Sequence, residues 1–191
     1  MLIVTAYTDN GGYAELVDAW IDSVRKRLPD SHFLVLRLGE IEKWKTAAHL
    51  KPWAILHGLQ TGFPRVAWID IDAEVVRTFE FPDGEWDLAF RQYREHSMTG
   101  TLLLKNSPKV RSFVADWARA SELSEEVRNQ LVFEKTLRDW TSPEAGRHRL
   151  EVHLLPPGMT FVSFDDRDAE VPWEERFVIH RLQGKLARRG R

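Results

Sequence analysis

The segment RVAWIDID at residues 65–72 constrains the fold of this chain more than any other. Its four consecutive apolar residues are typical of a strand that is buried on both faces, as in a parallel sheet covered by helices. Asp70 and Asp72 follow at its carboxyl end, where open α/β sheets bind their ligands. Because side chains alternate along a strand, the two carboxylates are expected to point the same way. The alternative is an acidic edge strand, since Asp70, Asp72 and Glu74 occupy alternate positions.

Two carboxylates side by side repel each other, so the pair requires a cation. A hard divalent ion with a phosphate would supply the missing partners. The late apolar run at 177–179 leads to His180 in the same way, and neutral imidazole is a common ligand of transition metals. Gly184 and Lys185 follow; glycine lets a backbone approach a phosphate, and lysine neutralises its charge. A histidine at a strand end is also a frequent structural residue, so the site hypothesis for His180 depends on the paired acids.

Three further positions carry polar residues beside predicted elements. Gln130 borders the buried face of a helix expected at 124–140, where its amide must bond either a ligand or nearby backbone. Thr5 and Tyr7 lie at the end of the first strand, where Tyr7 would stack on a base and Thr5 or Thr8 would bond its edge; the alternative is a plain exit from the strand. Lys51 is either a second phosphate partner or a solvated lysine.

Strands and helices alternate along most of the chain. Short apolar runs bounded by turn residues predict strands, and apolar stripes with helix-end signals predict helices. The expected strands span 2–6, 33–38, 65–69, 86–90, 101–104, 152–155, 160–164 and 177–179; the expected helices span 13–27, 41–59 with a break before Pro52, a segment that begins at Ser107 and Pro108, and 124–140. This order predicts an α/β fold in a single domain over 1–191. The expected architecture is a Rossmann-like, mostly parallel sheet with helices on both faces and a mixed edge formed by the short late strands.

The composition excludes several classes of site and protein. The chain has no cysteine, so disulfides, thiolate nucleophiles and cysteine-based metal sites are excluded. A net charge of −2 argues against a protein that binds nucleic acid over its whole surface, although the basic tail at 185–191 leaves a local contact with a polyanion open. No stretch approaches the ~20 apolar residues that span a bilayer. No signal peptide is visible, so a cytoplasmic protein is expected.

Taken in order, these motifs resemble those of nucleotide-sugar glycosyltransferases with the fold called GT-A. The closest subgroup is that of glycogenin-like and lipopolysaccharide galactosyltransferase enzymes. The resemblance covers nearly the whole chain: the apolar strand with Asp-x-Asp, a glycine-containing strand after Met98, the helix with Asn129 and Gln130, and His180 followed by Gly-Lys. The chain departs from the family at Thr99, where an asparagine is usual, at Asn129, where an aspartate is usual, and in a tail without tryptophan.

By this resemblance the chain would be a metal-dependent hexosyltransferase whose donor substrate is a nucleoside-diphosphate sugar, with a UDP-sugar favoured. Mn²⁺ or Mg²⁺ would be held against the donor diphosphate by Asp70, Asp72 and His180. The resemblance also implies contacts to the nucleotide from Thr5 and Tyr7, to the donor from Lys51, and to the phosphates from Gly184 and Lys185. The implied catalytic residues are Asp72 and Gln130.

Two mechanisms and two rival functions stay open at this point. A retaining enzyme would need little more than Gln130 or a backbone carbonyl near the anomeric carbon, whereas an inverting enzyme would need a base such as Asp165 or Asp166. The resemblance slightly favours retention. The rival enzyme is a haloacid-dehalogenase-like phosphohydrolase with Asp70 as its nucleophile. A nucleic-acid-binding module would explain neither the paired acids nor His180. The acceptor is open among a glycan, a lipid-linked saccharide, a protein and a modified nucleic acid.

Overall fold

The computed structural model of the protein describes residues 1–9, 12–41, 48–125, 128–162 and 171–180, and every structural statement below concerns these residues. The predictions for Gly184, Lys185 and the basic tail, and the candidate bases Asp165 and Asp166, lie outside the described residues. Within the described ranges, no helix is both long enough and apolar enough to cross a membrane.

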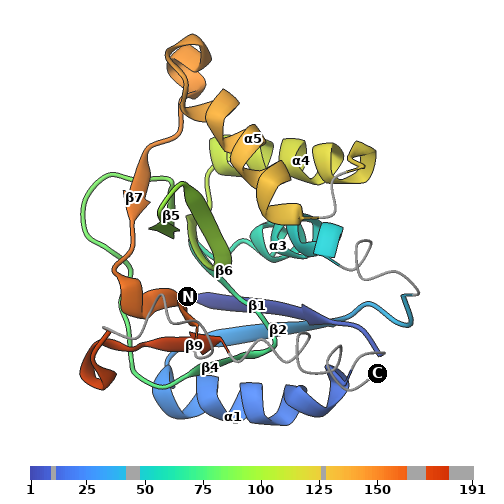
Figure 1. Ribbon diagram of the computed structural model, residues 1–191, viewed down its shortest axis with the longest axis vertical. Coiled ribbons are helices and arrows are strands. Elements are labelled where there is room, and N and C mark those ends of the chain that lie inside the picture. The colour runs from blue at the N-terminus through green and yellow to red at the C-terminus, as the bar shows by residue number, and fades with distance from the viewer. Residues whose placement is uncertain (10–11, 42–47, 126–127, 163–170, 181–191) are drawn as a thin grey trace.

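A six-stranded mixed sheet, in the order β2-β1-β3-β6-β5-β7, forms the centre of the molecule (Figure 1). β1 runs parallel to β2 and β3, and β5 runs parallel to β7, whereas β6 is antiparallel to both of its neighbours. Two residues join β5 to β6, and strands connected so closely run in opposite directions. The predicted α/β fold with a mostly parallel mixed sheet is confirmed. The strands are β1 (Leu2–Tyr7), β2 (His32–Arg37), β3 (Arg65–Ile69), β5 (Leu88–Tyr93), β6 (His96–Lys105) and β7 (Val152–Leu154).

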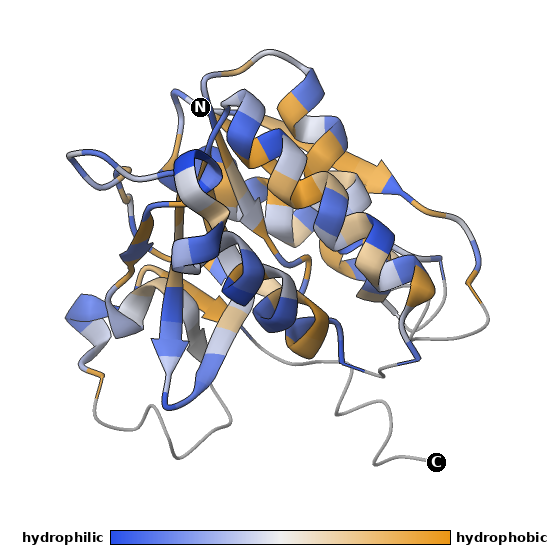
Figure 2. Ribbon diagram, turned by 90° about the horizontal axis from the view of Figure 1, so that it is seen from above, coloured by the Kyte–Doolittle hydropathy of each residue, from blue (hydrophilic) through white to orange (hydrophobic). Residues whose placement is uncertain are grey.

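Helices cover both faces of this sheet, as predicted (Figure 1). On one face lies α1 (Val17–Arg27), and on the other lie α3 (Lys51–Gln60), α4 (Pro108–Leu123) and α5 (Asn129–Thr141). Short 3-10 helices are η1 (Ala14–Leu16), η2 (Pro143–His148), η3 (Pro157–Thr160) and η5 (Trp173–Glu175). Figure 2 shows apolar strands in the interior and helices of mixed polarity around them. α5 starts later than the predicted residue 124, because Ser124 has extended backbone.

The central strand β3 is buried on both faces, as its apolar run predicts. Val66 and Trp68 pack under α3, α4 and α5, while Ala67 and Ile69 pack on the side of α1. This alternation is the two-residue period of a strand. β3 also has a hydrogen-bonded neighbour on each side, so the edge-strand alternative is wrong.

A second, three-stranded sheet contains the late strands. It has the order β4-β9-β8, with β4 (Ala73–Val75), β8 (Phe161–Val162) and β9 (Val178–His180). The expectation that the short late strands form a mixed edge of the main sheet is therefore wrong for β8 and β9. β9 instead pairs antiparallel with β4, the strand that begins just after the acidic segment at 70–72. This pairing places Ala73 opposite His180.

Helix α3 packs against β1 through a glycine. A Cβ atom built on Gly58 would lie 2.5 Å from Cγ2 of Val4, closer than carbon atoms approach each other in folded proteins. Pro52 lies in the first turn of α3, where its missing N–H costs no hydrogen bond, and Ile55 is fully buried beneath the helix. Gly58 therefore sets how closely α3, and with it Lys51 at its first position, lies against the sheet.

We predict that Gly58→Ala destabilises the protein by about 1–3 kcal/mol, the usual cost of overpacking a core. This loss outweighs the ~1 kcal/mol that alanine gains over glycine in an open helix. Val4→Ala removes Cγ2, so in a Val4→Ala background the added Gly58→Ala change should cost much less than it does in the wild type. Urea unfolding of both single variants and of the double variant measures the coupling. A Gly58→Ala protein that is more stable than wild type would contradict the close packing.

Candidate functional site

The two aspartates lie in a turn rather than on the strand itself. β3 ends at Ile69, and the backbone N–H of Ala73 donates to the carbonyl of Asp70 at 3.0 Å, which closes a turn over 70–73. The backbone N–H of Asp70 donates to the carbonyl of Gly100 on β6 at 2.9 Å. The expected convergence of the carboxylates is therefore present, but a turn at the carboxyl end of β3 causes it, not strand alternation.

His180 joins the two aspartates, as the sequence predicted. One ligand atom from each of Asp70, Asp72 and His180 lies within 4.8 Å of the other two. The pairing of β9 with β4 brings His180 there, because His180 is opposite Ala73, the residue that follows Asp72. The three predicted metal ligands thus form one cluster, although more than half of the chain separates the acids from the histidine.

The imidazole of His180 rests on Gly100. A Cβ atom at Gly100 would lie 2.5 Å from Cε1 of the ring, so only glycine leaves room for His180 in this position. The Thr101 hydroxyl lies 3.2 Å from Nε2, and His180 is only 3% exposed. Sequence reasoning assigned no site role to Gly100 or Thr101. The available signal was a glycine inside a strand, which often marks the close approach of another group.

Two donors hold the same oxygen of Asp70. Trp68 donates from Nε1 to Oδ1 at 2.6 Å, and the ammonium of Lys51 lies 2.7 Å from Oδ1. Lys51 also donates to the carbonyl of Thr99 at 3.2 Å, and its side chain is only 15% exposed. Lys51 is therefore not a solvated surface lysine. Trp68, a core residue by its sequence pattern, also orients a candidate ligand.

The electrostatics of the cluster favour a bound cation. Burial raises the pKa of Asp72 to about 6, the charge of Asp70 contributes to the rise, and Lys51 acts against it. Burial lowers the pKa of His180 to about 4, so its imidazole is neutral near pH 7, as metal binding requires. Carboxylate oxygens suit Mg²⁺ and Mn²⁺, and the imidazole nitrogen suits the transition ion. The donor set therefore fits the cation that the sequence implied.

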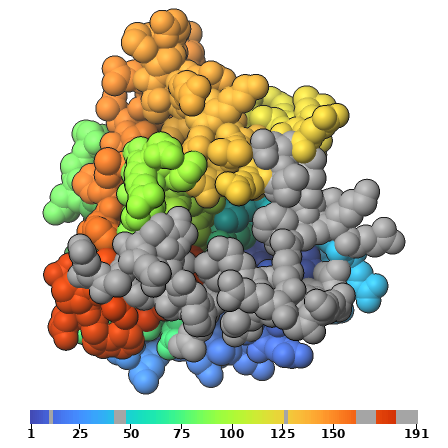
Figure 3. Space-filling view, in the orientation of Figure 1, coloured from blue at the N-terminus to red at the C-terminus, as the bar shows by residue number. Residues whose placement is uncertain are grey.

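Gln130 lies on α5, at the same end of the sheet. Its Nε2 donates to Glu134 Oε1 at 3.2 Å, and the same oxygen accepts from the backbone N–H of Ser97 at 2.7 Å. Figure 3 shows the yellow-green atoms of the β5–β6 hairpin beside the golden atoms of α5. Ser97 lies three residues before Gly100 on β6, so about 10 Å of strand separates it from the metal cluster. Asn129 is buried and donates to Ser121 Oγ at 3.2 Å, so its amide serves the packing of α5 on α4.

The end of β1 carries the residues expected to meet the nucleotide. Thr5 is fully buried, and among the described residues its hydroxyl has no hydrogen-bond partner. Tyr7 is the last residue of β1 and is partly exposed. Beyond it, Arg37 donates from Nε and Nη2 to the two carboxylate oxygens of Asp9, at 2.8 and 3.0 Å. This pair ties the loop after β1 to the end of β2.

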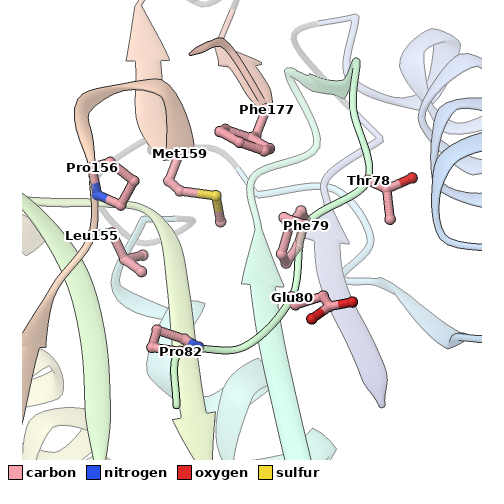
Figure 4. A pocket seen from close by; sticks show the side chains of 8 residues that line it. All are labelled: Thr78, Phe79, Glu80, Pro82, Leu155, Pro156, Met159 and Phe177. Atoms are coloured by element: carbon pink, nitrogen blue, oxygen red, sulfur yellow. The ribbon is translucent and has the colours of Figure 1, made fainter.

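The structure also contains an apolar cavity of about 390 Å³, whose lining side chains are drawn in Figure 4. Phe79, Met159 and Phe177 line it, with Thr78 and Glu80 among its exposed residues. Phe177 precedes β9, whereas His180 ends that strand, so the cavity and the cluster lie at opposite ends of β9. The cavity therefore contributes no residue to the site.

No protein-family model matches this chain, and no curated protein matches it. Several solved structures of glycosyltransferases are similar to it. A glycosyltransferase involved in the glycosylation of the major capsid of PBCV-1 is 12% identical, with 98% of each chain covered and a TM-score of 0.70. GlyE of Streptococcus pneumoniae is 16% identical over 94% of this chain and 53% of its own, with a TM-score of 0.61. The galactosyltransferase LgtC, solved with donor and acceptor sugar analogs, is 16% identical over 94% and 86%, with a TM-score of 0.54.

At these identities the likeness concerns the fold. The protein has the GT-A fold of these glycosyltransferases, as the resemblance of its motifs implied.

We predict that Gly100→Ala weakens Mn²⁺ binding by about 10- to 100-fold, the usual effect of disturbing a residue that orients a metal ligand. The new methyl group would push the His180 ring away from the aspartates. Isothermal titration calorimetry measures the affinity. In a His180→Ala background, the added Gly100→Ala change should have little effect, because the displaced ring is already gone. An equal loss in both backgrounds would contradict this role of Gly100.

We predict that Asp72→Asn stabilises the metal-free protein at pH 7.5 but not near pH 4. The pKa of Asp72 rises from 3.8 to about 6 on folding, so its contribution to stability is fully present below pH 3.8 and is lost as the pH rises through 6. At pH 7.5 the gain should be on the order of 3 kcal/mol, from a pKa rise of about two units at about 1.4 kcal/mol each. Urea unfolding in EDTA at several pH values tests this. The buried His180 is present in both proteins, so its contribution cancels when their stabilities are compared. A stability difference between variant and wild type that does not change with pH would contradict the prediction.

Proposed function

We propose that this protein is a metal-dependent glycosyltransferase that moves a sugar from a nucleoside-diphosphate-sugar donor to an acceptor nucleophile. The observation that carries the proposal is the convergence of Asp70, Asp72 and His180 at the carboxyl end of the central strand of a GT-A fold. Two acids and a neutral imidazole form a donor set for a divalent cation, and open α/β sheets bind ligands at this edge.

Departure of the diphosphate is the difficult step of such a transfer, because negative charge builds up on the leaving group. A divalent cation bound by Asp70, Asp72 and His180 would stabilise this charge. Lys51 adds a partly buried positive charge beside Asp70, where it would also attract the phosphates of a donor bound at the cluster. Trp68 holds the Asp70 carboxylate, and Gly100 with Thr101 holds the imidazole, so the ligands keep their positions when the donor arrives.

We further propose a retaining hexosyltransferase that favours UDP-sugars. Gln130 would meet the sugar of the donor; it lies on α5 at the same end of the sheet as the cluster, and its amide nitrogen donates to Glu134, which also accepts from the backbone N–H of Ser97 on β6. Thr5 and Tyr7 would meet the nucleotide at the end of β1. Gly184 and Lys185 would meet the phosphates. We propose that the enzyme acts in the cytoplasm as one domain over residues 1–191; its acceptor is open among a glycan, a lipid-linked saccharide, a protein and a modified nucleic acid.

A haloacid-dehalogenase-like phosphohydrolase is not favoured. Its first aspartate would have to attack a phosphorus atom as a nucleophile, yet in this structure Oδ1 of Asp70 accepts from both Trp68 and Lys51. The similar solved structures are glycosyltransferases, and in this chain the acidic turn follows β3, the third strand along the sequence, whereas such a phosphohydrolase carries its aspartates after the first.

We predict that the purified protein with Mn²⁺ slowly hydrolyses at least one sugar nucleotide from a panel of UDP- and GDP-sugars. Asp72→Ala should lower this rate at least about 100-fold, because the variant lacks one ligand of the cation that stabilises the leaving group. Release of the nucleoside diphosphate, followed by chromatography, measures the rate. Asp139→Ala, an exposed change on α5, is the matched control and should keep the wild-type rate.

A phosphohydrolase would give a different set of results. Cleavage of p-nitrophenyl phosphate with Mg²⁺, abolished by Asp70→Asn and not accompanied by turnover of any sugar nucleotide, would contradict the proposed transferase and indicate a phosphohydrolase.

A further inference from the structure

Lys51 contributes a positive charge to a site that is built to bind a positive ion. Its ammonium lies 2.7 Å from Oδ1 of Asp70, a candidate ligand, and 3.2 Å from the carbonyl oxygen of Thr99. A divalent ion at Asp70, Asp72 and His180 would therefore stand beside this ammonium, and two positive charges at that distance repel each other strongly in a partly buried site.

The charge of Lys51 acts on the other two candidate ligands as well as on Asp70. It acts to lower the pKa of Asp72, and it also contributes to the lowered pKa of His180, whose main cause is burial. Together with the direct ion pair to Asp70, Lys51 interacts electrostatically with every candidate ligand. In the metal-free protein it partly neutralises the two aspartates, the role that the divalent ion would otherwise fill.

The two donors to Asp70 differ in how freely they move. Trp68 is 3% exposed in the core under α3, so its Nε1 is a fixed donor to Oδ1. Lys51 has a flexible four-carbon stem at the first position of α3, and its ammonium lies 5.5 Å from the centre of the Trp68 ring. Lys51 is therefore able to leave Asp70 while Trp68 keeps the carboxylate in place.

We propose that Lys51 is a resident counter-ion that competes with the divalent cation for Asp70 and transfers to the diphosphate when the donor binds. The second half of this proposal rests on the proposed function. In the absence of nucleotide, Lys51 weakens metal binding. With a nucleoside diphosphate present, both positive charges gain a negative partner, so cation and nucleotide bind synergistically.

The first experiment measures Mn²⁺ affinity without nucleotide, by electron paramagnetic resonance of free Mn²⁺. Lys51→Met should bind Mn²⁺ at least roughly fivefold more tightly than wild type, the lower end of usual coupling between sites. This direction is opposite to the effect expected for loss of a metal ligand. Equal or weaker binding by Lys51→Met, or no Mn²⁺ binding by either protein, would overturn the competition.

Lys109→Met is the matched control. Lys109 is also a partly buried lysine in an ion pair, 2.5 Å from Asp87, but Asp87 precedes β5, at the opposite end of the sheet from the cluster. The variant loses the same charge and should keep the wild-type Mn²⁺ affinity. Lys51→Gln serves as a second variant, since its amide is able to donate to Thr99 and Asp70; it should also bind Mn²⁺ more tightly, and its melting temperature checks that it folds.

The second experiment repeats the Mn²⁺ titration with saturating UDP. UDP should tighten Mn²⁺ binding to wild type by roughly 5- to 150-fold, and by a clearly smaller factor in Lys51→Met. An equal factor in both proteins would overturn the transfer to the diphosphate. If UDP and GDP bind neither protein, the proposed donor is wrong and the transfer is overturned with it, whereas the first experiment still decides the competition for Asp70.

Discussion

The pairing of β4 with β9 is the interaction on which the candidate site depends. The main sheet leads to two aspartates at the carboxyl end of β3, and among the described residues His180 is the one candidate ligand that joins them. β4 starts immediately after Asp72, and its antiparallel register with β9 puts His180 across from Ala73. Backbone hydrogen bonds between two short strands thus determine which side chain completes the cluster. The glycine at position 100 then leaves the space that the imidazole fills.

The charges of the two aspartates and Lys51 partly offset one another in the cluster, and neighbouring core side chains hold them in position. Asp70 and Asp72 repel each other, and burial makes the charged form of Asp72 still less favourable. Lys51 offsets part of this repulsion, and Trp68 fixes the orientation of Asp70. Such a site has a free-energy cost in its metal-free state, which a divalent ion and an anionic ligand together would remove. Such a cost is typical of binding sites, where a ligand supplies the missing charge.

The sequence pattern predicted the parts of the fold that depend on local signals. The apolar run before Asp70 marked the central strand, and Ser107, whose hydroxyl accepts from Val110, marked the start of α4. β6 was predicted only from residue 101, because its first half, around Ser97 and Thr99, lacks an apolar run. The separate sheet of β4, β8 and β9 was not foreseen, since the choice of strand partner is a long-range property.

The candidate site shows the same division between local and long-range information. Asp70, Asp72 and His180 were recognised because each follows an apolar run, and the structure brings them together. The supporting contacts were not recognised. The indole of Trp68 and the strand glycine at 100 look like ordinary core residues until the partner across the sheet is known. The sequence therefore indicated the candidate ligands, whereas the contacts from Trp68 and Gly100 that position these ligands are visible only in the three-dimensional structure.

The order of the ligands along the chain has a consequence for how the protein folds. More than half of the chain lies between Ala73 and its strand partner His180, and closing so long a loop is slow compared with forming local hairpins such as β5–β6. During synthesis, the ribosome releases the acidic turn long before the histidine emerges. A nascent chain thus displays the pair of acids before its imidazole, and the complete cluster requires that β9 has already paired with β4.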